Sequence, residues 1–465
     1  MLRAVLLAFS LALIAGTAPV RATEEFTGRL ASGAYYHVQI PDGWQPGGPL
    51  VLYQHGLDFT TPHNTPGLGP LRSVMLAEGY AIAATSYSER GWALFSAIDD
   101  NRDLLAEFDA LAGAPGEIVP FGGSMGGLVT LKLAEAPGFP PVRGAYALCP
   151  AAGGARLWDA AIDLRLAFDA VCSADGAGEF PEGDQPLPWA LDLFEVPDGL
   201  GDLLDTSLLL PVLVPLEQCT GVSLPPVLRN DAMQRRLDEL MAFMHITDED
   251  FFVTNVGYAT YVMSDLVRAD DKLDDRNPFT TAGVDYSSDP LIDATILRIV
   301  ADPDAATELH RVSDFAGMVG DAKILSMHTS HDQLVIPGNE DFVRDALPAD
   351  QRTIAIVDED EPTHCGFSDA EGLAGWEALR AWKDGAPQPS VADLQQSCNE
   401  LVASAGVDGP CRFDPNAEIV PFDDIVRPRP PLTPTTPGHS RHQRPREPAP
   451  TRVAKTAHGL PPLER

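Results

Sequence analysis

Apolar residues along the first 150 positions follow two alternating spacings. Short, nearly continuous apolar runs predict buried strands at residues 36–40, 50–54, 80–85, 117–121 and 144–148. Between them, residues 97–111 carry apolar side chains at helical spacing, and residues 70–78 and 124–136 also predict helices. This alternation of strand and helix predicts a largely parallel sheet that is covered by helices.

The alternation stops near residue 151 and resumes at residue 323. The intervening 151–322 contains helix-like stretches such as 231–244, separated by acidic loops with Pro and Gly. Beyond it, strands are predicted at 323–327 and 353–357, and helices at 340–346 and 372–383. We therefore expect an α/β core formed by residues 23–150 and 323–425, with a large, mainly helical cap inserted between the sixth and seventh strands.

The first 22 residues have the composition of a signal peptide. Arg3 supplies a positive charge, an apolar run follows from Ala4 to Ala15, and Val20 and Ala22 are small residues before a cleavage site. The apolar run of about 12 residues is shorter than the roughly 20 that a membrane-spanning helix needs. The sequence thus predicts a secreted or periplasmic protein without a membrane span.

Residues 426–465 are rich in Pro, Arg and His. From Arg427 onward, eight Lys and Arg stand against two Glu, which gives this tail a net charge of about +6. Because the whole chain has a net charge of −35, the rest of the chain carries about −41. Because this tail has few apolar residues, we predict that it is disordered. The strongly acidic body argues against nucleic acid as a partner, since phosphate binding requires Lys and Arg.

Six cysteines are compatible with disulfides in an oxidising compartment. Cys398 and Cys411 are close in sequence, and Cys172 and Cys219 both fall in the proposed insertion, so we expect these two pairs. Cys149 and Cys365 would either bond to each other or stay buried and free. The sequence has no Cys-x-x-Cys or Cys/His spacing typical of zinc, so no metal site is predicted.

The segment Gly122-Gly123-Ser124-Met125-Gly126 matches the pattern Gly-x-Ser-x-Gly between a predicted strand and a predicted helix. A tight strand-to-helix turn exposes a serine hydroxyl, and small neighbours let two backbones approach. The start of the following helix also offers N–H groups to a developing negative charge. Ser124 is therefore our candidate nucleophile.

A serine nucleophile needs a histidine as base and an acid that orients this histidine. His364 lies in the loop after the last strong strand, and Asp332 in the loop after strand 323–327. Loops at the carboxyl ends of parallel strands share one edge of the sheet, so Ser124, Asp332 and His364 can meet. The alternatives are His310, His328 and His331 for the base, and Asp358 and Asp360 for the acid.

An oxyanion hole needs two backbone N–H donors. Met125, directly after the nucleophile, is one candidate. Leu57, which follows the strand 50–54, is the other, with Gly56 allowing close approach. His55 is interpreted as a packing residue that supports this loop.

These motifs together resemble those of the α/β-hydrolase superfamily. The resemblance covers about residues 35–149 and 323–383, and it is carried by His55-Gly56, the Ser124 motif, the Asp332 loop that ends in Val-Ile-Pro, and the His364 loop. It implies a mostly parallel eight-stranded sheet flanked by helices, a cap after the sixth strand, and hydrolysis through an acyl-enzyme. No organic cofactor or metal is implied.

The favoured function is hydrolysis of a carboxylic ester, in a small molecule or a polymer. Two alternatives stay open: a serine peptidase of the same fold, similar to aminopeptidases, and a binding protein without activity. A minority of the apolar residues in the insertion, among them Trp189 and the run 208–214, are expected to line a substrate pocket. Acyl length, the type of ester and the oligomeric state are not predicted.

Overall fold

The computed structural model describes residues 23–58, 64–173, 176–178, 180 and 206–430. The predicted signal peptide, Trp189 and most of the predicted tail lie outside these ranges. Within them, no helix combines the length and the apolar content that crossing a bilayer requires.

An eight-stranded sheet forms the centre of the fold, with the strand order β1-β2-β4-β3-β5-β6-β7-β8. The pairs β1–β2 and β2–β4 are antiparallel, and all pairs from β4 to β8 across the sheet are parallel. The mostly parallel sheet is therefore confirmed. In chain order, the strands are β1 (Thr23–Arg29), β2 (Tyr35–Pro41), β3 (Pro49–Gln54), β4 (Ala81–Thr85), β5 (Glu117–Gly123), β6 (Gly144–Leu148), β7 (Lys323–Thr329) and β8 (Arg352–Val357).

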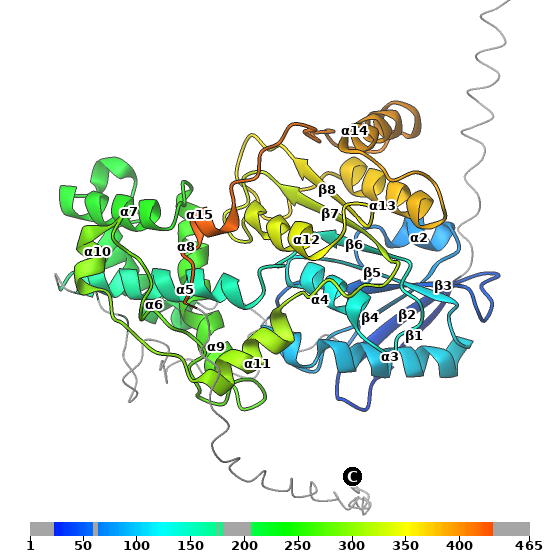
Figure 1. Cartoon of the computed structure of the whole chain (residues 1–465), viewed down its shortest axis with the longest axis horizontal. Helices are drawn as coiled ribbons and strands as arrows, with labels where there is room; N and C mark the ends of the chain where they lie inside the picture. The colour runs from blue at the N-terminus through cyan, green and yellow to red at the C-terminus, as the bar shows by residue number, and fades with distance from the viewer. Residues whose placement is uncertain (1–22, 59–63, 174–175, 179, 181–205, 431–465) are drawn as a thin grey trace, which may run out of the picture. The chain divides into compact units, whose positions relative to one another are not determined.

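Helices cover both faces of this sheet (Figure 1). Strand β6 illustrates the division, because successive side chains of a strand point to opposite faces. Tyr146 packs in the same apolar cluster as Trp376, whereas Ala145 belongs to the cluster of Leu128 on the other face. The first face carries α2 (Arg72–Ala77), α13 (Asp369–Lys383) and α14 (Val391–Glu400), and the second carries α3 (Ala97–Ala112), α4 (Met125–Glu135) and α12 (Glu340–Ala346).

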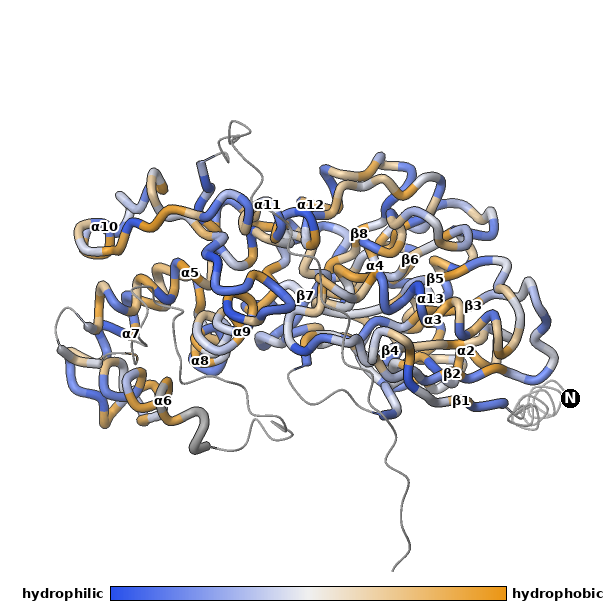
Figure 2. The backbone as a smooth tube through the Cα atoms, turned by 90° about the horizontal axis from the view of Figure 1, so that it is seen from below, coloured by the Kyte–Doolittle hydropathy of each residue, from blue (hydrophilic) through white to orange (hydrophobic). Residues whose placement is uncertain are grey.

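A long helical segment connects β6 to β7, where the sequence predicts an insertion. Figure 2, in which apolar residues are orange, shows apolar stretches along these helices as well as along the strands of the sheet. Cys172 and Cys219 form the expected disulfide within it, and Cys398 and Cys411 form the other expected pair in the C-terminal part of the core. The helices of the segment are α5 (Ala155–Phe168), α6 (Thr206–Thr220), α7 (Asp231–Phe243), α8 (Glu249–Gly257), α9 (Met263–Arg268), α10 (Pro290–Thr295) and α11 (Pro303–Ser313), with π-helical turns η2 (Asp169–Ser173) and η5 (Tyr258–Val262).

The chain after the short helix α15 (Phe422–Ile425) continues along the helical segment as far as Pro430. Val426 is buried, and the Arg427 and Arg429 side chains are mostly buried in ion pairs with Asp289 and Asp163. Composition places these last five residues in the tail that is predicted to be disordered, whereas the structure describes them and largely buries these three side chains. The physical reason is that partly buried carboxylates bind the arginines, which an apolar count does not register.

Candidate active site

Ser124 stands at the turn between β5 and α4. Its backbone has φ 59° and ψ −128°, a conformation that a residue with a side chain rarely adopts. The flanking glycines permit this turn. A Cβ on Gly122 would lie 2.4 Å from the carbonyl oxygen of Gln54, and one on Gly126 would lie 2.2 Å from that same oxygen. The sharp turn thus depends on residues without side chains on both sides of Ser124.

The three predicted residues of the triad come together in one hydrogen-bonded chain. His364, in the loop between β8 and α13, has its Nε2 at 2.9 Å from Oγ of Ser124. Its Nδ1 lies 2.7 Å from Oδ2 of Asp332, in the loop after β7. With Nδ1–H donating to the carboxylate, Nε2 is free to accept the serine proton. The alternative acids Asp358 and Asp360 are exposed, and Asp358 accepts a hydrogen bond from Ser330.

The loop of Asp332 holds its carboxylate in a fixed orientation. Asp332 is only 2% exposed, and its Oδ1 accepts hydrogen bonds from the backbone N–H groups of Leu334 and Val335 at 2.9 and 3.0 Å. One carboxylate oxygen is therefore held by its own loop, and the other is left to His364.

His328, one of the alternative bases, makes hydrogen bonds that support the loop of Asp332. It is fully buried, its Nδ1 lies 3.1 Å from a carboxylate oxygen of the buried Glu340, and its Nε2 donates to the carbonyl of Val335 at 2.6 Å. Burial by itself would lower the pKa of His328, but the Glu340 carboxylate overcomes this effect and the pKa is raised. His331 is exposed, and His310 pairs with Asp314.

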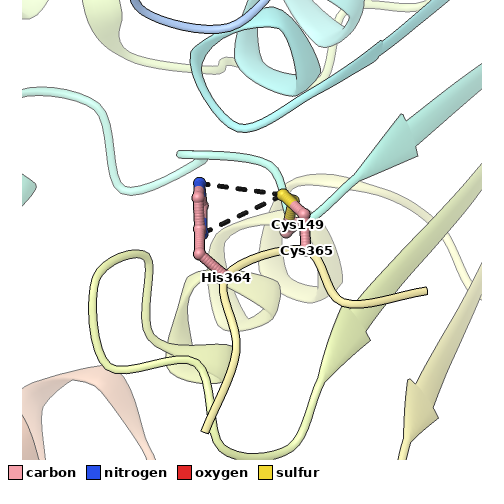
Figure 3. Close-up of side chains that lie close together, drawn as sticks. All are labelled: Cys149, His364 and Cys365. Atoms are coloured by element: carbon pink, nitrogen blue, oxygen red, sulfur yellow. Dashed lines mark hydrogen bonds between the residues drawn. A yellow bond between two sulfur atoms is a disulfide. The ribbon is translucent and has the colours of Figure 1, made fainter. Parts of the chain in front are cut away.

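A disulfide joins Cys149, directly after β6, to Cys365, directly after His364. Figure 3 shows the sulfur of Cys365 beside the imidazole of His364, and the distances from Sγ to Nε2 and Nδ1 are 3.7 and 3.9 Å. Both cysteines have positive φ, 38° and 56°. The open alternative for these two cysteines is thus resolved as a bond. Although their sulfurs and His364 lie close enough to share a metal ion, disulfide sulfurs are not the thiolates that bind metals.

The two proposed oxyanion donors lie next to Ser124. Leu57 and Met125 line the same cavity as the serine, and a Cβ on Gly56 would lie 3.6 Å from the Cβ of Ser124. Met125 is the first residue of α4, where backbone N–H groups have no partner within the helix. His55 stacks on Tyr87 with ring centroids 4.2 Å apart, in agreement with a packing role.

A cavity of about 80 Å³ opens beside Ser124. Its walls are mainly apolar, and they come from both the core and the helical segment. Of the run 208–214, Val212 is buried and Leu210 and Val214 are exposed, and none of the three lines this cavity. The lining side chains of the helical segment are instead those of Leu157, Trp158, Ala160, Ala161, Met244, Ile246, Asn255 and Tyr258.

Gln333 ties the acid loop to this helical segment. Its side-chain oxygen accepts hydrogen bonds from the backbone N–H groups of Thr247 and Asp248 at 2.8 and 3.1 Å, and its backbone carbonyl accepts one from Asn255 at 3.0 Å. The residue after Asp332 therefore joins the core to the wall of the cavity.

No protein-family model and no curated protein matches the chain. Among solved structures, the chain is similar to dipeptidyl peptidase 4 from Porphyromonas gingivalis, with 11% identity and a TM-score of 0.39, over 81% of this chain and 37% of that one. It is also similar to the rice cell wall degrading esterase LipA from Xanthomonas oryzae, with 12% identity and a TM-score of 0.37, over 80% and 93% of the two chains. An esterase from Pyrococcus furiosus is 10% identical, with a TM-score of 0.34, over 79% and 92%.

The fold is defined by the strand order, by the serine turn after β5, and by the loops after β7 and β8 that reach this serine. The protein has the α/β-hydrolase fold.

Proposed function

We propose that the protein is a secreted serine hydrolase that cleaves carboxylic esters. The observation that carries this proposal is the hydrogen-bonded chain from Ser124 through His364 to Asp332, with distances of 2.9 and 2.7 Å. These are the contacts through which a histidine activates a serine and an acid orients the histidine.

In the proposed reaction, Oγ of Ser124 attacks the ester carbonyl while Nε2 of His364 takes the hydroxyl proton. The carbonyl oxygen becomes an oxyanion, which the N–H groups of Met125 and Leu57 would stabilise. His364 then gives its proton to the leaving alcohol, and an acyl-enzyme on Ser124 is formed. A water molecule, deprotonated by His364, releases the acid and restores the serine.

The apolar cavity supports an ester with an apolar group on one side of the scissile bond. Its walls beside Ser124 include Trp92, Trp158 and Leu334, and burial of an alkyl or aromatic group against them is favourable. In this proposal the helical segment acts as the cap of the active site, because it supplies one wall of the cavity.

A serine peptidase of the aminopeptidase type is the less favoured function. Such an enzyme requires acids that hold the ammonium group of its substrate. Among the described residues that line the cavity, the side chains with polar groups include Asn255, Tyr258 and Gln333, and none is a carboxylate. A binding protein without activity is also disfavoured, because binding does not require three residues aligned for proton transfer.

Turnover of p-nitrophenyl esters and of aminoacyl-nitroanilides by the purified protein tests the reaction class. We expect hydrolysis of the esters, with little or no cleavage of the anilides. Preferential cleavage of the anilides would establish the peptidase instead. Absence of both activities, in a protein that also resists organophosphorus reagents, would favour a binding function.

Secretion is proposed from two features. Residues 1–22 have the composition of a signal peptide, and three disulfides join the six cysteines. Disulfides persist in oxidising compartments and are rare in the cytosol.

A further inference from the structure

The C-terminal strap, which we define as residues 420–430, runs from the core to the helical segment and reaches the cavity of Ser124. Ile425 and Val426 line this cavity. They are more than 290 residues from Ser124 in sequence, and they belong neither to the sheet nor to the helical segment between β6 and β7. The strap is thus a third, separate part of the cavity wall. Figure 1 shows its helix α15 between the sheet and the helical segment.

The core end of the strap is held by α15. The ring of Phe422 packs edge-on against Phe342 with centroids 4.9 Å apart, and its backbone N–H donates to the Asp341 carboxylate at 2.9 Å. Gly338 approaches closely, since a Cβ there would lie 2.9 Å from the Cα of Phe422. These contacts hold the strap against residues 338–342, which follow the loop of Asp332.

Two arginines of the strap, Arg427 and Arg429, hold its other end to the helical segment. The guanidinium of Arg427 lies 3.7 Å from the ring centroid of Phe243 and donates to Asp289 at 2.9 Å. The guanidinium of Arg429 donates to Asp163, on α5, at 2.8 Å. Cation–π contacts and ion pairs with little solvent exposure hold a chain more firmly than surface pairs do.

Arg156 of α5 holds the middle of the strap. It donates to the carboxylate of Asp423 at 3.1 Å and to the backbone carbonyls of Val426 and Arg427, both at 3.3 Å. The residues that line the cavity therefore lie between anchors on either side, so their position is set by the strap and not by the sheet.

We propose that Ile425 and Val426 are specificity-determining residues that limit how far the apolar group of an ester extends from Ser124. The proposal rests on the proposed function, and it assigns to the strap the selection of chain length. Because Ile425 and Val426 carry no group that transfers protons, their substitution alters selection and leaves the reactivity of Ser124 intact.

The experiment compares two fluorophosphonates, one with an ethyl chain and one with a dodecyl chain, by their second-order rate constants for labelling of Ser124. Ile425→Trp narrows the cavity, so it is expected to lower the dodecyl rate roughly tenfold, while the ethyl rate stays within about twofold. Ile425→Ala should shift the ratio of the two rates in the opposite direction. Val420→Trp is the control, because Val420 is 55% exposed on the same strap.

A second pair of variants tests the anchors. Arg427→Met removes the ion pair with Asp289. It should bring the labelling rates of the ethyl and dodecyl fluorophosphonates closer together. Arg311→Met removes an ion pair that is exposed on α11 and should change neither rate. Equal effects of Ile425→Trp on both reagents, or no effect on either, would overturn the proposal.

Failure of the proposed function has a different signature. The wild-type protein would then react with neither reagent and hydrolyse no ester. Binding of a fluorescent dodecanoate, which requires no catalysis, still decides the question of the strap in that case. Binding about tenfold weaker in Ile425→Trp supports the proposal, and equal binding contradicts it.

Discussion

The two parts of the candidate active site are built in different ways. Ser124, Asp332 and His364 follow three strands of one sheet, and hydrogen bonds join their side chains. The apolar cavity beside them combines walls from the core, the helical segment and the C-terminal strap. Under the proposed function, reactivity would depend on one edge of the sheet, whereas substrate selection would depend on how distant segments pack together.

If this distinction is correct, substitutions should separate into two groups. Changes at the sheet edge should lower the rate for every substrate, because they act on proton transfer and on nucleophilic attack. Changes in the cavity wall should reorder substrates.

The largest effect is expected for the nucleophile. Ser124→Ala should fold and lose roughly 10⁵- to 10⁶-fold in kcat, and His364→Ala should lose about as much, because the triad acts as a unit. Ester hydrolysis under saturating substrate measures this, with circular dichroism as the control for folding. Retention of more than a few per cent of activity in Ser124→Ala would refute the assignment of the nucleophile.

Asp332→Asn should have the next largest effect, a loss of about 10⁴-fold in kcat. The amide cannot accept the Nδ1–H of His364 as the carboxylate does, so the imidazole loses its orientation and its tautomer. Asp358→Asn is the matched control, because Asp358 is an exposed acid in the loop after β8. A larger loss in the control than in Asp332→Asn would reverse the assignment of the acid.

Removal of the Cys149–Cys365 disulfide should have an intermediate effect. The double variant Cys149→Ala/Cys365→Ala loses the sulfur that packs beside His364, and we expect kcat/KM to fall roughly 10- to 100-fold for all esters. The chain-entropy model also gives a loss of about 5 kcal/mol in the free energy of unfolding, because this bridge spans 216 residues.

Cys398→Ala/Cys411→Ala is the control for this effect. Its bridge spans 13 residues, and neither cysteine is next to a triad residue in the sequence. In the same model, its loss lowers the free energy of unfolding by about 3 kcal/mol. Activity measured well below both melting temperatures should fall only in the first variant. Equal activity of the two variants would mean that the Cys149–Cys365 bridge contributes stability alone.

The smallest effect concerns Glu89, in the loop after β4. Burial raises the pKa of Glu89 to about 8, and the Asp271 carboxylate of the helical segment adds to this rise. The folded state therefore holds a proton that the unfolded state releases near pH 4.5, so stability falls as pH rises from about 4.5 to 8.

Glu89→Gln should remove this pH dependence and melt a few degrees higher than the wild type at pH 9, with little difference at pH 5. Thermal melts across this range measure it, and Glu418→Gln at an exposed position is the control. Identical pH profiles for Glu89→Gln and the wild type would contradict the burial effect.

Most of the core could be predicted from the sequence because its elements are governed by local patterns. The apolar run 144–148 coincides with β6, and the helix 340–346 with α12. Strand β1 was not predicted, since its sequence is polar and its side chains are largely exposed at the sheet edge. The triad residues could be proposed because each follows a strand whose pattern is clear.

The supports of the triad could not be predicted in the same way. The contact of His328 with Glu340 and the packing of Cys365 against His364 depend on side-chain geometry. The adjacency of Cys365 to His364 was the one available signal in the sequence. The packing of Arg427 and Arg429 could not be predicted either, because charge and proline content do not reveal which buried carboxylates an arginine will meet.

The account depends most directly on Ser124 being the residue that forms the covalent intermediate. Labelling the wild-type protein with a fluorophosphonate, followed by mass spectrometry of its peptides, tests this claim. We predict one added phosphonyl group per chain, located on Ser124 and absent from His364→Ala at the same exposure time. A label on another residue, or an unlabelled protein that still hydrolyses esters, would contradict the account.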